Sequence, residues 1–297
     1  MKTIFTTEAQ RTRRKTERTI VTVLPDENAR RLFVIDVHLV APFHITRTVP
    51  CFLCASVVKN MSDVLIEARG IVAGYGASRV LHGVDLVLNR GEAVGLMGRN
   101  GMGKTTLLRS VLGLLAQKEG QVKVRGVDMT HAAPHRIARA GIAYVPEGRG
   151  IFADLSVEEN LVMAARPGIG GKRGWTLARV LSVFPRLAER LGHGGQQLSG
   201  GEQQMLTIGR ALLTNPDVLI LDEATEGLAP LVAREIWAIL GQLRETGMSA
   251  IIVDKNFSAV SSMSDRNIVL VKGRVVMQGS AADLKRDPEA LQRHLGV

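Results

Sequence analysis

Residues 62–297 alternate between short apolar runs and segments whose apolar residues recur at helical spacing. The apolar run "EAVGLM" (92–97) precedes "KTTLLRSVLGLL", and "PDVLILDE" (216–223) is a second apolar run. The segment "MLTIGRALL", directly after "LSGGEQQ" (198–204), shows the helical spacing again. Short apolar runs between helical patterns are typical of buried strands. The pattern therefore predicts an α/β fold, with a mostly parallel sheet covered by helices on both faces.

Residues 1–60 follow neither pattern. They begin with the polar, basic stretch "TTEAQRTRRKTERT" and continue with β-branched runs that Pro42 and Pro50 interrupt. Several acids, from Glu8 to Asp36, argue against an organelle transit peptide. We therefore expect either a poorly ordered N-terminal extension or a misassigned start, with the true start at Met61. Residues 61–297 are expected to form one domain.

Composition narrows the possible functions only slightly. The chain has 297 residues, 45% of them hydrophobic and 22% charged, as in a globular protein. No run approaches the 18 apolar residues of a membrane-spanning helix, and no secretory signal begins the chain, so a cytoplasmic location is expected. The net charge of +10 is spread thinly and aromatic residues make up only 4%, which disfavours nucleic-acid binding. Such a charge would suit an anionic membrane surface.

The two cysteines, Cys51 and Cys54, form a single C-x-x-C. No second pair and no histidine at zinc-finger spacing accompanies them. Two inert thiols are the simpler interpretation, and zinc or redox chemistry is the alternative.

The segment "GRNGMGKTT" (98–106) has the spacing Gly98-x-x-x-x-Gly103-Lys104-Thr105 of a phosphate-binding loop. It lies between a predicted strand and a predicted helix, as such a loop requires. Backbone N–H groups of residues 100–105 would surround the β-phosphate, Lys104 would reach the β- and γ-phosphates, and the hydroxyl of Thr105 would bind Mg²⁺. The alternative is a glycine loop that only turns the chain.

Two adjacent acids, Asp222 and Glu223, end the apolar run at 216–223. A buried strand would bring them to the carboxyl edge of the sheet, where open α/β folds bind their ligands. We expect Asp222 in the magnesium shell and Glu223 as the general base for the attacking water. The alternative is a pair of solvated acids at a strand end.

The serine and glycines of "LSGGEQQ" stand at a predicted helix start, which can bind an anion. In this order, "GRNGMGKTT", "LSGGEQQ" and "VLILDE" are similar to the motifs of the nucleotide-binding subunits of ABC transporters, over about residues 62–297. The resemblance implies that two subunits pair head to tail, with ATP between them. Ser199, Gly200 and Gly201 would then contact the γ-phosphate of the partner's nucleotide.

Further ATP-binding positions follow from the resemblance. Tyr75 would stack on adenine and Val80 would pack beside it, although a strand tyrosine can also be a core or surface residue. The resemblance also implies nucleotide contacts from the whole loop, which comprises Gly98, Arg99, Asn100, Gly101, Met102, Gly103, Lys104, Thr105 and Thr106.

Two positions depart from the usual family pattern. Most of these subunits have a glutamine where "YVPEGRGIFADLSVEENL" (144–161) has Glu147, which could still bind Mg²⁺ or water. In the same segment, Ser156 and Glu159 form a capping box. In "IIVDKNF", Lys255 takes the place of a histidine that contacts the γ-phosphate. Lys255 would either donate to that phosphate or point into solvent.

The resemblance implies a P-loop (RecA-like) ATPase core with an antiparallel β subdomain and an inserted α-helical signature subdomain at about 147–198. The segments "PEGRGIF" and "ATEGLAPLVAREIW" resemble the smaller ATPase of branched-chain amino-acid importers. A second ATPase subunit, membrane permease subunits and, indirectly, a solute-binding protein would be the partners, at the cytoplasmic face of the membrane. A urea or amide importer and a lipopolysaccharide exporter are alternatives. A soluble ABC ATPase of DNA repair or translation is an alternative of another class.

Overall fold

The computed structural model describes residues 63–115 and 118–296. The predictions for residues 1–60, for Cys51 and Cys54 and for a start at Met61 lie outside the described residues. Among those described, no helix is both long and apolar enough to cross a membrane.

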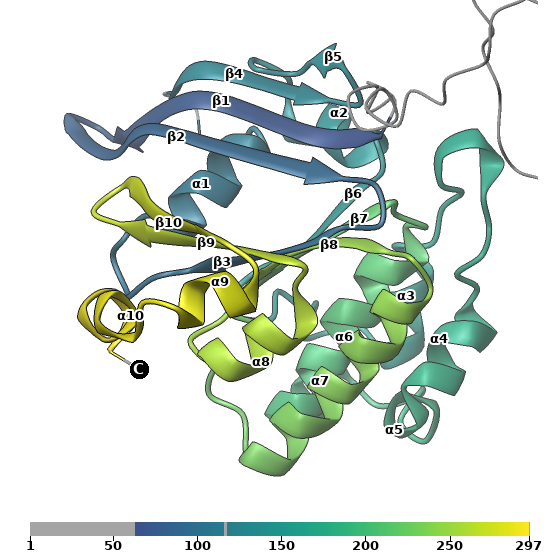
Figure 1. The fold of residues 1–297 in the computed structure, drawn as a ribbon. Coiled ribbons are helices and arrows are strands. Elements are labelled where there is room, and N and C mark those ends of the chain that lie inside the picture. The colour runs from purple at the N-terminus through teal and green to yellow at the C-terminus, as the bar shows by residue number, and fades with distance from the viewer. Residues whose placement is uncertain (1–62, 116–117, 297) are drawn as a thin grey trace, which may run out of the picture. The chain divides into compact units, whose positions relative to one another are not determined.

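One layer is an antiparallel sheet in the order β2-β1-β4-β5 (Figure 1). Its strands are β1 (Val64–Tyr75), β2 (Ser78–Asn89), β4 (Lys118–Val124) and β5 (Val127–Asp128). One face of β1 and β2 is buried with Leu107, Leu108 and Val111 of helix α1 (Lys104–Val111). This sheet therefore covers the helix that begins at the predicted phosphate loop.

The second layer is a six-stranded sheet in the order β10-β9-β3-β8-β7-β6. The pairs from β9 to β6 are all parallel, and only β10 runs antiparallel to its neighbour. The bounds are β3 (Ala93–Met97), β6 (Ile142–Val145), β7 (Val218–Asp222), β8 (Ser249–Val253), β9 (Arg266–Val271) and β10 (Arg274–Gly279). Because β3, β8, β7 and β6 are parallel, the segments that follow them meet at one edge of the sheet.

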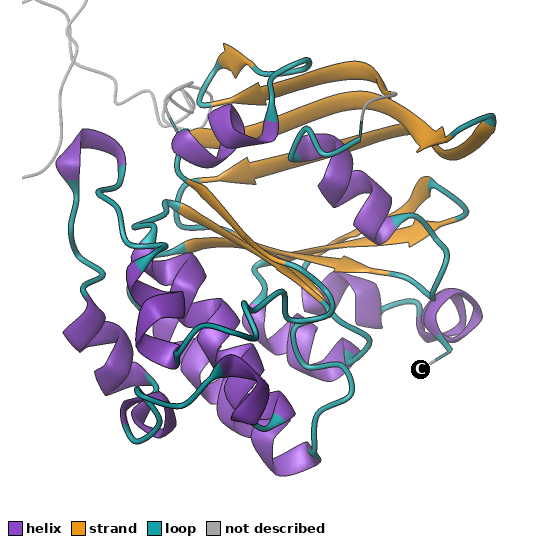
Figure 2. Ribbon diagram, turned by 180° about the vertical axis from the view of Figure 1, so that it is seen from behind, coloured by secondary structure: helices purple, strands orange, loops and turns teal. Residues whose placement is uncertain are grey.

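Helices pack on the far side of this sheet (Figure 2). The longest are α6 (Gly200–Leu213) and α7 (Pro230–Glu245), whose buried residues share a core with β7. The shorter helices on this side are α8 (Phe257–Met263), α9 (Ala281–Lys285) and α10 (Pro288–Leu295). Helix α2 (Pro134–Arg139) packs on the opposite side, with the antiparallel sheet and α1 (Figure 1).

Several short helices lie along the span predicted for the helical subdomain. They are α3 (Val157–Val162), η1 (Ile169–Gly171), α4 (Leu177–Val183), α5 (Pro185–Ala188) and η2 (Gly195–Gln197). Ser156 and Glu159 form the expected capping box at the start of α3. The two sheets and their helices confirm the predicted α/β fold class.

Candidate active site

The phosphate loop joins β3 to α1 and depends on three glycines with positive φ. Gly98 has φ 148°, Gly101 75° and Gly103 103°. At Gly98 a Cβ atom would lie 2.4 Å from the carbonyl oxygen of Leu270 in β9, so no other residue fits without movement. Gly103 is the N-cap of α1, and among the described residues no side chain caps that helix. The first N–H groups of α1 are therefore available to an anion.

Lys104 is held inside this loop. Its side chain is 4% exposed, and Nζ donates to the carbonyl oxygens of Gly98 at 2.9 Å and Arg99 at 3.3 Å. The same Nζ lies 3.5 Å from Oε1 of Glu223. The ammonium is thus fixed beside the loop that would surround the phosphates, and its contact with them stays a prediction.

Asp222 and Thr105 meet across the sheet edge. Oγ1 of Thr105 donates to Oδ1 of Asp222 at 3.2 Å, and the hydroxyl of Tyr144 donates to Oδ2 at 2.9 Å. Asp222 is fully buried, and this burial raises its pKa above the ordinary value. Burial and the neighbouring Asp222 charge also raise the pKa of Tyr144. The sequence reasoning missed Tyr144, which lies next to the last residue of β6, a strand that pairs with β7.

Glu223 has a strained backbone and an unusual carboxyl group. Its φ is 52°, which is left-handed and rare outside glycine, and its N–H donates to the Val253 carbonyl at 2.8 Å. Burial, together with a hydrogen bond to Glu226, raises the pKa of Glu223 to about 7. A carboxyl group that titrates near neutral pH suits a general base.

Lys255 points toward this carboxyl group and not away from the site. Its Nζ forms an ion pair with Glu226 and lies 3.8 Å from Oε2 of Glu223. The hydrogen bonds of Glu226 with Glu223 and Lys255 lower the pKa of Glu226. The ion pair raises the pKa of Lys255. Glu226 is a second residue that the sequence reasoning missed.

Glu147 joins the same group of acids. One carboxylate oxygen from each of Glu147, Glu223 and Glu226 lies within 4.8 Å of the others. Of the predicted metal ligands, Thr105 contacts Asp222 directly, and Glu147, which groups with the other glutamates, is near enough to Asp222 for its charge to raise the pKa of Asp222. All these donors are oxygens, which Mg²⁺ prefers, so the residues fit that ion.

The predicted adenine-binding residues lie at the edge of the antiparallel sheet. Tyr75 is 46% exposed, and its hydroxyl accepts a 3.4 Å hydrogen bond from Nη1 of Arg109 in α1. Val80 lies close to the phosphate loop, because a Cβ atom on Gly103 would be 3.3 Å from its Cγ1. Contact of Tyr75 or Val80 with adenine stays a prediction.

Contacts with the end of the sheet support the rest of the phosphate loop. The carbonyl oxygen of Met102 accepts from the N–H of Gly273, and its sulfur from the N–H of Lys272. Nη2 of Arg99 donates to the carbonyl oxygen of Arg293 at 3.5 Å. The loop is thus braced by residues far downstream in the chain.

The signature turn begins α6 and has structural contacts of its own. Ser199 forms a capping box with Glu202, whose carboxylate accepts from both the N–H and the hydroxyl of Ser199 at 2.8 Å. A Cβ on Gly200 would lie 2.7 Å from the guanidinium of Arg149, and one on Gly201 2.3 Å from the side chain of Val232. Contact with a partner's nucleotide stays a prediction for this turn.

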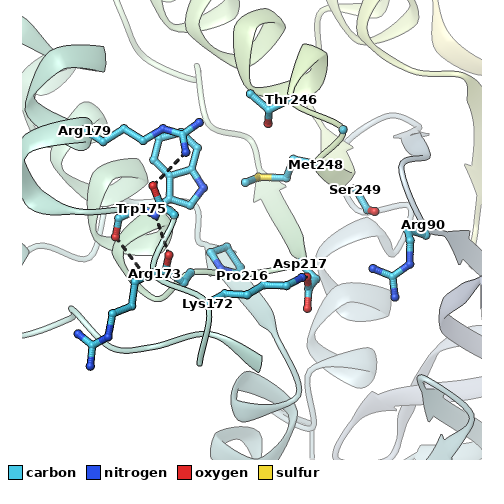
Figure 3. Close-up of a pocket in the computed structure, with 13 residues that line it drawn as sticks. Arg90, Lys172, Arg173, Trp175, Arg179, Pro216, Asp217, Thr246, Met248 and Ser249 are labelled. Carbon is cyan, nitrogen blue, oxygen red and sulfur yellow. Dashed lines mark hydrogen bonds and ion pairs between the residues drawn. The ribbon is translucent and has the colours of Figure 1, made fainter. Parts of the chain in front are cut away.

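A cavity of about 500 Å³ opens at the other edge of the sheet, between the amino ends of β7 and β8 (Figure 3). Its lining includes Lys172, which donates to Asp217 at 2.9 Å, and Trp175, over which the Arg179 guanidinium stacks at 4.0 Å. The cavity lies at the opposite ends of the strands from the phosphate loop and does not belong to the candidate active site.

Comparisons with known proteins agree with this geometry. The sequence profile of the ABC transporter family matches residues 81–226. The chain is 40% identical over 222 residues to the high-affinity branched-chain amino acid transport ATP-binding protein BraG of Pseudomonas aeruginosa, covering 75% of this chain and 95% of BraG. It is 31% identical over 233 residues to the lipopolysaccharide export system ATP-binding protein LptB of Escherichia coli K12, covering 78% and 97%.

A solved structure of an ATP-binding subunit of an ABC transporter superposes with a TM-score of 0.65 at 29% identity, covering 76% of this chain and 93% of that one. In each of these comparisons the matched region spans nearly the whole length of the other protein. The chain therefore belongs to the ABC transporter family, as an ATP-binding protein that hydrolyses its nucleotide.

Proposed function

We propose that this ATPase energises a membrane importer of branched-chain or related amino acids. The observation that carries the proposal is the 40% identity to BraG over nearly its whole length, against 31% to LptB. Lipopolysaccharide export is the second candidate, because the LptB match covers 97% of that protein. A urea or amide importer and a soluble ATPase of DNA repair or translation remain alternatives from the sequence.

The proposed assembly contains a second ABC ATPase subunit, different from this chain, that pairs with it head to tail. Permease subunits in the membrane would bind the pair at the cytoplasmic face, and a solute-binding protein would deliver the solute to them. The exposed side chains of Phe152 and Met163, near the Glu147 segment, support a contact with another subunit. The two ATPase subunits would close on each other when ATP binds and reopen after hydrolysis. The Glu147 segment would transmit this movement to the permease.

The proposed chemistry uses the geometry of the sheet edge. Backbone N–H groups at the start of α1 and the ammonium of Lys104 bind the phosphates and stabilise the charge of the transition state. Glu223 accepts the proton of a water molecule as the water oxygen attacks the γ-phosphorus in line. The bond from that phosphorus to the bridging oxygen breaks, which yields ADP and phosphate.

Magnesium is part of this proposal. Thr105, Asp222 and Glu147 would hold the ion, which supplies charge stabilisation to the phosphate oxygens when bound. Thr105 and Asp222 are already joined by a hydrogen bond, and Tyr144 orients the second oxygen of Asp222. A hydrogen bond to a carboxylate that binds a metal ion, such as the bond from Tyr144 to Asp222, fixes the orientation of that carboxylate.

A genetic experiment tests the transport function. The gene is deleted in its native host and restored as wild type or as Glu223→Gln, and uptake of labelled leucine is measured. The proposal expects uptake to depend on the wild-type copy alone. Unchanged uptake together with loss of lipopolysaccharide at the cell surface would favour the export function instead.

A further inference from the structure

The ammonium of Lys255 lies between two carboxylates that differ in burial. Its ion pair with Glu226 is within hydrogen-bond distance, while Oε2 of Glu223 is 3.8 Å away, beyond the reach of a hydrogen bond. The Glu223 side chain is 9% exposed and that of Glu226 is 36% exposed. The lysine is therefore hydrogen-bonded to the more exposed acid and keeps only a longer ion pair, at 3.8 Å, with the more buried one.

Short hydrogen bonds hold the two loops that carry this ion pair. Oγ1 of Thr225, next to Glu226, donates to Oδ2 of Asp254, next to Lys255, at 2.6 Å. Oδ1 of Asp254 accepts from the N–H of Asn256 at 3.0 Å. Thr225 and Asp254, the chain neighbours of the two ion-paired residues, are thus joined to each other, which keeps the loops of Glu226 and Lys255 side by side.

The ammonium of Lys255 would prevent Glu223 from acting as the base if it moved into hydrogen-bond distance of that carboxylate. Oε1 of Glu223 already faces the ammonium of Lys104 at 3.5 Å. If Lys255 closed on Oε2, both oxygens would be bound to cations, and a carboxylate so bound is a weak proton acceptor. The burial of Glu223 would strengthen an ion pair between Glu223 and Lys255, because charges interact more strongly away from water.

We propose that Glu226 is a positioning residue that acts as the counter-ion of Lys255, holding its ammonium off Glu223 so that Oε2 stays free to accept a proton from water. This inference rests on the proposed role of Glu223 as the base. Glu226 touches neither nucleotide nor water in this role. Its counter-ion effect on Glu223 passes through Lys255 and is separate from the direct hydrogen bond between the two glutamates, which raises the pKa of Glu223.

A double-mutant cycle of the full chain tests the proposal by steady-state ATPase activity. Glu226→Gln lets Lys255 close on Glu223, and kcat falls roughly tenfold with KM for ATP unchanged. In the Lys255→Gln background no ammonium can close, so Glu226→Gln changes kcat by less than about twofold. Glu245→Gln, at an exposed position at the end of α7, is the matched control and leaves kcat unchanged.

Two kinetic results overturn the proposal. One is an equal loss of kcat in both backgrounds, which means that Glu226 acts without Lys255. The other is a kcat of the single Glu226→Gln variant that stays within about twofold of wild type.

A crystal structure of the full-length Glu226→Gln variant tests the same inference without any measurement of activity. We expect Nζ of Lys255 to move into hydrogen-bond distance of Oε2 of Glu223. A lysine that turns into solvent, or keeps its place, overturns the counter-ion role. Normal hydrolysis by Glu223→Gln would instead reject the base assignment, so the two failures are distinguishable.

Discussion

The hydroxyl of Thr105 and the carboxylate of Asp222 are 117 positions apart in the sequence and form a 3.2 Å hydrogen bond at the sheet edge. Thr105 is the second residue of α1, the helix that follows β3, and Asp222 ends β7, with β8 between the two strands. Tyr144, which lies in β6 on the far side of β7, completes the arrangement. Three segments of the chain thus position one buried carboxylate.

Tyr144→Phe is expected to weaken the response to magnesium. The variant loses the only atoms that donate to Oδ2 of Asp222 among the described hydrogen bonds, so the orientation of that oxygen is no longer fixed. The magnesium concentration for half-maximal ATPase activity should rise about tenfold, as for other outer-shell partners of a metal. A magnesium titration of the purified variant measures this, and an unchanged curve would rule out a role for Tyr144.

Lys104→Ala should abolish most of the nucleotide binding. A hydrogen bond from a charged group is worth about 1.5–3 kcal/mol, so affinity should fall roughly 10- to 150-fold. Titration with a fluorescent ATP analogue gives the affinity. Lys285→Ala, at the exposed end of α9, is the control and should bind as wild type does. Equal binding by both variants would contradict the phosphate-loop assignment.

Glu223→Gln should bind ATP and hydrolyse it very slowly. The amide keeps the shape of the side chain but cannot accept the proton of the water, while Lys104 and the loop are unchanged. Chromatography of the bound nucleotide after incubation should therefore find ATP in the variant and ADP in the wild type. Recovery of ADP at the normal rate would show that another group is the base.

The pH dependence of hydrolysis should report the raised pKa of Glu223. Only the deprotonated carboxylate accepts a proton, so kcat/KM should fall as the pH drops through about 7 and level off above it. An ordinary glutamate would keep its activity down to a pH near 4.5. The profile is measured at constant ionic strength and saturating magnesium. A flat profile between pH 5 and about 8 would refute the assignment.

Ser199→Asp separates the cap of α6 from its proposed contact with a partner's ATP. Aspartate is as good an N-cap as serine, so the melting temperature should hold, while its charge would repel a γ-phosphate. Hydrolysis by the assembled transporter should fall, and ATP binding by the isolated chain should not. Ser280→Asp changes an equivalent capping box at α9 and should leave both unaffected. Equal activity of the two variants would argue against the contact.

Local patterns in the sequence are enough to predict the phosphate loop, the acids after β7 and the capping box at Ser156, because each depends on residues within one short segment. The fold class follows from the alternation of strands and helices. Tyr144 and Glu226 could not be found in this way, since their partners depend on the strand order of the sheet, which no local pattern specifies. The direction of Lys255 is likewise decided by Glu226.

The capping box of Ser199 was within reach of the sequence, because it repeats the S-x-x-E spacing found at Ser156. The resemblance to a signature motif implies a contact with the partner's phosphate, but it does not imply the hydrogen bonds within the turn. The hydroxyl of Ser199 donates its one proton to Glu202 and accepts from the Glu202 N–H, so donation to a partner's phosphate would require that hydroxyl to release Glu202.

The close approach of Gly98 to Leu270 has a consequence for any attempt to cut this protein into smaller working parts. Every recognised motif ends by Lys255, yet the wall against which the phosphate loop folds belongs to β9 and to the turn at Lys272 and Gly273. A fragment that ends just after Lys255 would contain every recognised motif. It would lack the residues against which the phosphate loop folds. The conformation of the phosphate loop therefore depends partly on the last thirty residues of the chain, and the loop sequence alone does not determine it.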